Sequence, residues 1–140
     1  LSEGRWYKND PYIEDYGSQI YIFKIAYGDL NGDGNRDAAI VWVENDYKAQ
    51  GFFYEVVIVL NDNGQAKHVA TKFIDNKPGI EKFYIKNGSV CIQVVMHDGD
   101  DHGCCPTHRK LLKYTIKDST VVEERINLGT IEEGYISPGG

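Results

Sequence analysis

The segment "EKFYIKNGSVCIQVV", residues 81–95, indicates the fold more clearly than any other part of the chain. Two runs rich in apolar and β-branched residues flank the pair Asn87-Gly88. A two-residue turn of type I′ needs positive φ at both central positions, which Asn-Gly adopts at little cost. The segment therefore predicts a β-hairpin.

The same pattern extends along the chain, because short apolar segments alternate with turns rich in Asn, Asp, Gly and Pro. No stretch keeps a 3.6-residue apolar repeat, so helix is expected only in a small piece such as residues 11–16. The predicted strands span residues 20–27, 38–44, 52–60, 66–74, 80–86, 89–97, 109–117 and 120–127.

We therefore expect one all-β domain over residues 1–140, made mainly of antiparallel hairpins in a sandwich or a partly closed sheet. Residues 1–17 are expected to form a loosely ordered lead-in with a short strand near Arg5, and residues 132–140 a frayed tail. A chain of 140 residues is too short for a closed propeller. The run "AAIVWV", residues 38–43, does not alternate, so it predicts a central strand that is covered on both faces, whereas residues 54–61 and 91–97 admit polar residues on one side.

The charge of the chain limits its partners. Asp and Glu number 21 against 15 Lys and Arg, giving a net charge of −6, which argues against binding to nucleic acid or anionic lipid. No apolar run is long enough for a transmembrane helix, and no signal peptide is recognisable at Leu1. The sequence starts without Met, which suggests either a trimmed chain or a mature form whose targeting segment, with or without a lipid anchor, lies outside the given chain.

The segment "GDLNGDGNRDAAIVW", residues 28–42, concentrates acids and amides before an apolar strand. Oxygen-bearing side chains recur at every second position, with glycines between them, as in loops that coil around Ca²⁺. The oxygen ligands disfavour zinc and copper. The sequence therefore predicts a structural Ca²⁺ site, and its expected ligands are Asp29, Asn31, Asp33, Asp37 and, through its carbonyl, Asn35.

Two features qualify this prediction. The Glu that closes an EF-hand at loop position 12 is missing, because Ile40 stands there, so a helix–loop–helix sensor is excluded. The loop resembles instead the Asp-rich loops of FG-GAP blades in integrin-type propellers. The alternative is a polar, Asx-rich turn that binds no ion.

A second cluster lies in "HDGDDHGCCPTH", residues 97–108. Its His97, His102 and His108, together with Cys104 and Cys105, are a candidate site for zinc or copper. Adjacent cysteines rarely bind one tetrahedral ion, and the usual spacing of zinc ligands is absent. A Cys–His nucleophile lacks a recognisable third residue, so no catalytic residue is predicted.

A disulfide explains the cysteines more simply. Cys91 lies on the strand that leads into the cluster, where it can pair with Cys104 or Cys105 if the loop folds back. In the alternative pairing, Cys104 bonds to Cys105 and Cys91 remains a buried thiol. The sequence does not decide between these pairings.

The order of four segments, "LSEGRW", "GDLNGDGNRDAAIVW", "GFFYEVVIVLNDNG" and "GCCPTH", resembles a family of bacterial exported proteins and lipoproteins of uncharacterised function. The chain departs from that pattern at Ala49-Gln50-Gly51, where those proteins tend to have Gly-Ser-Gly. The resemblance implies a periplasmic, cell-surface or secreted location and supplies no catalytic residues.

We therefore expect a non-enzymatic, calcium-stabilised module that binds or scaffolds a protein or glycan. The rival expectation is a hydrolase or redox enzyme that uses the loop of residues 97–108.

Overall fold

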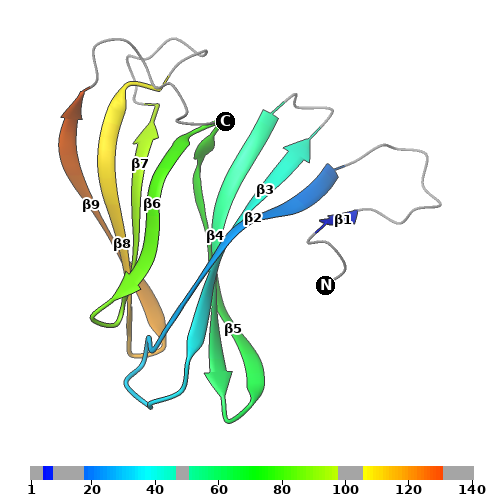
Figure 1. Ribbon diagram of the computed structural model, residues 1–140, viewed down its shortest axis with the longest axis vertical. Coiled ribbons are helices and arrows are strands. Elements are labelled where there is room, and N and C mark those ends of the chain that lie inside the picture. The colour runs from blue at the N-terminus through cyan, green and yellow to red at the C-terminus, as the bar shows by residue number, and fades with distance from the viewer. Residues whose placement is uncertain (1–4, 8–17, 47–50, 98–105, 131–140) are drawn as a thin grey trace.

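The computed structural model describes residues 5–7, 18–46, 51–97 and 106–130, and in these residues the protein is all-β (Figure 1). Two antiparallel sheets face each other, one with strand order β1-β2-β3-β4-β5 and the other with order β6-β7-β8-β9. The sheets do not close into a barrel. Within each sheet every strand pairs with its neighbour in the chain, which confirms the predicted fold of antiparallel hairpins.

All eight predicted main strands are present, and their ends lie within three residues of the predicted ones. The short β1 also agrees with the strand expected near Arg5. The strands are β1 Arg5–Tyr7, β2 Ser18–Gly28, β3 Asp37–Asp46, β4 Gly51–Asp62, β5 Gln65–Asn76, β6 Gly79–Lys86, β7 Ser89–Met96, β8 His108–Lys117 and β9 Thr120–Thr130. The expected helical piece at residues 11–16 and the frayed tail lie outside the described residues, as does most of the lead-in. The described part of the chain contains no helix that is long and apolar enough to cross a membrane.

The turns have the backbone conformation that their residues predict. Asn87 and Gly88, between β6 and β7, have φ values of 51° and 76°. Positive φ at both positions is the property that a type I′ turn requires, so the predicted hairpin is confirmed. Asp118 and Ser119, between β8 and β9, also both have positive φ.

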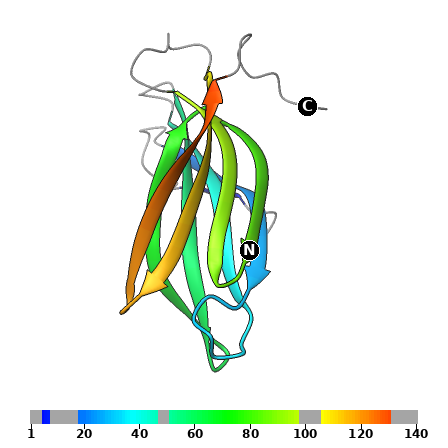
Figure 2. The same cartoon turned by 90° about the vertical axis from the view of Figure 1, so that its left-hand side faces the viewer.

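The hydrophobic core lies between the two sheets. Figure 2 looks onto the four-stranded sheet, with the five-stranded sheet behind it. At one edge of the sandwich Gly28 of β2 approaches β6 so closely that an added Cβ would lie 2.6 Å from Ile85 Cγ2. The fully packed core residues are Leu30, Ala39, Val41, Val56, Ile58, Ile74, Val90, Ile92, Val94, Met96, Leu112 and Tyr114.

The prediction that residues 38–43 are covered on both faces is wrong. Along β3 burial alternates strictly, so that Ala39 and Val41 are fully buried while the side chains between them are only partly buried. The strand with nearly continuous burial is β7. Part of the outer face of β7 is covered by side chains that hydrogen-bond to one another. Arg109 donates to Glu81 at 2.7 and 2.8 Å, and Gln93 donates to the same carboxylate at 3.0 Å.

Candidate metal centre

Three carboxylates converge where the loop between β2 and β3 enters β3. One oxygen from each of Asp29, Asp33 and Asp37 lies within 4.8 Å of the other two. Ligands at 2.3–2.6 Å from a shared Ca²⁺ are at most roughly 5 Å apart, so this spacing suits a single ion of that size. The cluster can therefore hold a metal ion.

Asp29 organises the first half of the loop. Its Oδ1 accepts the N–H groups of Asn31 at 3.2 Å and Gly32 at 2.8 Å, and its Oδ2 accepts the N–H of Gly34 at 2.8 Å. The hydrogen bond from Gly34 is the main reason that the pKa of Asp29 lies below its ordinary value of 3.8. The carboxylate is thus ionised at neutral pH, as a cation ligand must be.

The two glycines of the loop are needed for its path. Gly32 and Gly34 have φ values of 78° and 83°, in the left-handed region that other residues rarely adopt. Between them Asp33 accepts the N–H of Asn35 at 2.8 Å, and its own N–H bonds to the side chain of Asn31 at 3.3 Å. The chain therefore coils tightly, and its three carboxylates converge.

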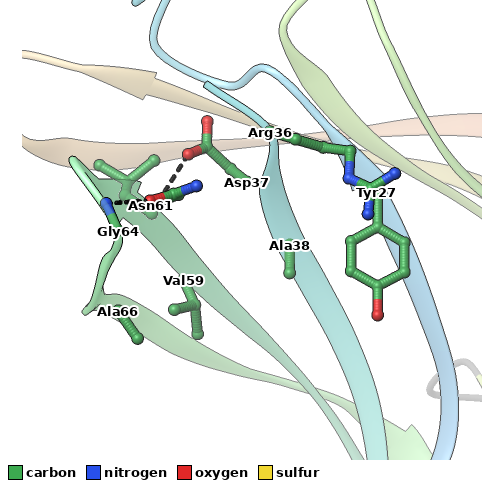
Figure 3. Close-up of a pocket in the computed structure, with 9 residues that line it drawn as sticks. Tyr27, Arg36, Asp37, Ala38, Val59, Asn61, Gly64 and Ala66 are labelled. Carbon is green, nitrogen blue, oxygen red and sulfur yellow. Dashed lines mark hydrogen bonds between the residues drawn. The ribbon is translucent and has the colours of Figure 1, made fainter. Parts of the chain in front are cut away.

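Asp37 connects the loop to the rest of the sheet. It is only 1% exposed, and its two oxygens accept the N–H groups of Leu30 and Asn61, each at 2.7 Å. Asn61 in turn accepts the N–H of Gly64 at 2.7 Å, within the turn between β4 and β5 (Figure 3). One buried carboxylate therefore joins the candidate ion loop to the neighbouring hairpin.

A groove of about 330 Å³ lies beside this junction (Figure 3). One side carries Tyr27 with the guanidinium of Arg36 stacked 4.7 Å from its ring centre. Ala38 and Val59 lie in the middle, and the turn that contains Gly64 borders the other side. The groove and the acid cluster share Asp37.

The structure thus brings the carboxylates of three of the five predicted ligands close together. The side chains of Asn31 and Asn35 lie in the same loop, where Asn35 Nδ2 donates to Asp33 at 3.4 Å. Hydrogen bonds of this kind occur both in empty polar turns and in loops coiled around an ion. The convergence of three acids, which repel one another unless a cation lies between them, is the feature that favours an ion.

The second predicted site is described only at its two ends. His97 Nδ1 lies 2.9 Å from Asp75 Oδ2, which also accepts the backbone N–H of His97 at 2.7 Å. His97 Nε2 is buried and has no hydrogen-bond partner among the described residues. His108 Nδ1 is 3.1 Å from Thr107 Oγ1, whereas His102, Cys104 and Cys105 lie outside the described residues.

Asp75 is the residue at this second site that sequence reasoning missed. It lies on β5, 22 positions before its partner, and only sheet packing brings the two together. Its flanking sequence "FIDNK" reads as an ordinary strand end, so no local signal marks it.

Cys91 is a free, buried thiol whose Sγ lies 3.9 Å from the carbonyl oxygen of Ser89. The structure therefore does not contain the pairing of Cys91 with Cys104 or Cys105. The alternative pairing, between Cys104 and Cys105, stays a prediction.

Comparison with known proteins gives no relative from which a role can be transferred. No family model matches the chain, and neither the curated proteins nor the solved structures contain a match.

Proposed function

We propose that the protein is a non-enzymatic binding or scaffolding module of the bacterial cell envelope, stabilised by one Ca²⁺ in the loop between β2 and β3. The observation that carries this proposal is the convergence of Asp29, Asp33 and Asp37 within 4.8 Å. A site made only of oxygen ligands from protein side chains suits Ca²⁺ better than Mg²⁺, which is smaller and keeps several waters. It also disfavours metals that prefer sulfur and nitrogen ligands.

The position of Asp37 supports a structural role for the ion. Because Asp37 already binds the backbone of Leu30 and Asn61, an ion on its carboxylate would tie the loop to the hairpin of β4 and β5. Both ends of the loop run directly into long strands, which leaves little room for the movement that a calcium sensor needs.

Three further features support an extracytoplasmic location. Weak Ca²⁺ sites need a high concentration of Ca²⁺, which is found outside the cytoplasm. The adjacent cysteines at positions 104 and 105 of the sequence suit an oxidising compartment. The resemblance to exported bacterial proteins and lipoproteins points the same way, and the expected ligand is a protein or a glycan.

Thermal unfolding with and without calcium tests the proposal. A ligand present at about 100 times its dissociation constant stabilises the folded state by about 2.7 kcal/mol. For a domain of this size we expect the Tm in millimolar CaCl₂ to exceed that in EGTA by about 5–10 °C. The combined substitution Asp29→Asn with Asp33→Asn should abolish this rise.

The matched control is Asp62→Asn, which removes one exposed carboxylate near the β4–β5 turn but outside the cluster. It should keep the full calcium response. An unchanged Tm in calcium, or a rise that survives the double substitution, would contradict the proposal.

A second candidate function, a hydrolase or redox enzyme, is favoured by one observation. Asp75 holds His97 through Nδ1, as a carboxylate orients the imidazole base of many hydrolases. Turnover of activated esters and of small disulfides by the native chain, measured against His97→Gln, tests this candidate. Turnover that His97→Gln abolishes would establish the enzyme, whereas no turnover by the native chain would reject it for these substrates.

A further inference from the structure

The outer face of the five-stranded sheet is apolar, although it points away from the core. Strand register aligns Ile25, Ile40 and Val57 in one row across β2, β3 and β4. A second row contains Ile22, Trp42 and Phe73, with Glu55 between the last two. The charge of Glu55 is partly satisfied, because Trp42 Nε1 donates to it at 2.9 Å.

This face exposes large apolar side chains. Tyr27 is 54% exposed, Phe73 52% and Ile25 38%. An antiparallel sheet with one face in water normally alternates apolar and polar residues, so that the wet face is polar. Between these exposed side chains, which lie on β2 and β5, the face continues through Ile40 and Trp42, which are partly buried, and Val57, which is 5% exposed. An apolar sheet face of this kind marks an interaction surface.

The opposite outer face, on the four-stranded sheet, is mixed, because lysines lie there beside the exposed Tyr84, Val122 and Ile126. It carries Lys82 and Lys86 on β6 and Lys113 on β8, and Ser89 and Thr115 join their hydroxyls at 2.7 Å. If copies stacked head to tail, these lysines would be buried against an apolar sheet without partners, which is costly. The apolar face is therefore complementary to itself and not to the lysine face.

The size of the face suits a weak dimer. Four strands spaced about 4.8 Å apart and eight residues long outline about 500 Å². Two such faces together bury on the order of 1,000 Å², near the lower end of stable interfaces. We infer that a second copy of this chain covers the outer face of the five-stranded sheet, giving a two-fold dimer in which the two sheets stack face to face.

This inference goes beyond the calcium site and does not depend on it. The test is sedimentation equilibrium of the full chain at about 1 to 200 μM, in CaCl₂ and in EGTA, a range that brackets a weak interface. The expected species at the highest concentration has twice the 15.8 kDa mass of one chain, and it dissociates on dilution. A mass of 15.8 kDa at every concentration would overturn the inference.

Paired variants make the test specific. Ile25→Lys and Phe73→Lys each place a charge on the apolar face and should weaken the dimer at least tenfold. Ile126→Lys changes a side chain that is 41% exposed on the lysine-bearing sheet and should leave the dimer unchanged. Circular dichroism verifies that each variant is folded. If Ile126→Lys weakened the association as much as Phe73→Lys, the assigned face would be wrong.

Discussion

The buried carboxylate of Asp37 accepts the backbone N–H of Asn61 at 2.7 Å, across the junction between two loops at one end of the sandwich. Its second oxygen accepts the N–H of Leu30 at the same distance. Asp37 therefore organises the protein before any ion binds. This separates its role from that of Asp29 and Asp33, whose hydrogen bonds stay within their own loop.

Because Asp37 accepts two hydrogen bonds, we expect Asp37→Asn to lower the free energy of unfolding. An amide has only one acceptor oxygen, so its NH₂ group would face one of the two N–H donors. A buried donor without a partner costs about 1–3 kcal/mol, and we expect this loss in EGTA, where no ion contributes. Urea unfolding measures it. Asp33→Asn is the control and should lose little stability in EGTA; equal losses in the two variants would contradict the assigned role.

The lowered pKa of Asp29 predicts how stability depends on acid. Because the folded-state pKa lies below 3.8, this carboxylate stabilises the folded state above that pH, and the contribution is lost as pH falls further. The calcium-dependent rise in Tm should therefore be maintained from about pH 7 to pH 5 and decline only below about pH 4. Melting curves in CaCl₂ and EGTA across this range provide the measurement. A response already lost at pH 5 would show that a group with a higher pKa controls binding.

The close approach of Gly28 to Ile85 predicts a strong coupling between the two sheets. In Gly28→Ala the new methyl group would lie 2.6 Å from Ile85 Cγ2, and overpacking of this kind costs about 1–3 kcal/mol. Ile85→Ala should recover part of this loss, so a double-mutant cycle should show coupling of about 0.5–3 kcal/mol. Gly64→Ala, whose Cβ would meet no atom within 4 Å, should be additive with Ile85→Ala. Additivity in both cycles would mean that the sheets do not meet at Gly28.

The free thiol of Cys91 predicts the chemistry of the other two cysteines. Mass spectrometry of the unreduced, digested protein should find Cys104 and Cys105 in one peptide that is 2 Da lighter than its dithiol form, as expected for oxidation to a disulfide. Cys91 should react with iodoacetamide only after unfolding, because it is 6% exposed. A disulfide-linked peptide containing Cys91 would contradict the structure.

Local turn chemistry explains why the strands were predictable from the sequence. Asn87-Gly88 and Asp118-Ser119 encode hairpin turns directly, and each pair has the positive φ values that such turns require. The convergence of Asp29, Asp33 and Asp37 was predictable because these three residues lie close together along the chain.

Properties that depend on the packing of distant strands were not predictable. The run at residues 38–43 is apolar at every position because its outward-facing side chains belong to an apolar sheet face. Among the described residues, no second layer covers these side chains. Periodicity alone does not separate these two cases. The contact of Asp75 with His97 likewise depends on how the two sheets are placed.

The central claim, one Ca²⁺ held by the loop between β2 and β3, is tested most directly by a crystal structure grown in millimolar CaCl₂ with anomalous data. The account predicts an anomalous peak between Asp29, Asp33 and Asp37, with oxygen ligands at about 2.3–2.6 Å. A well-ordered loop whose carboxylates contact only backbone N–H groups and water, with no peak between them, would contradict it.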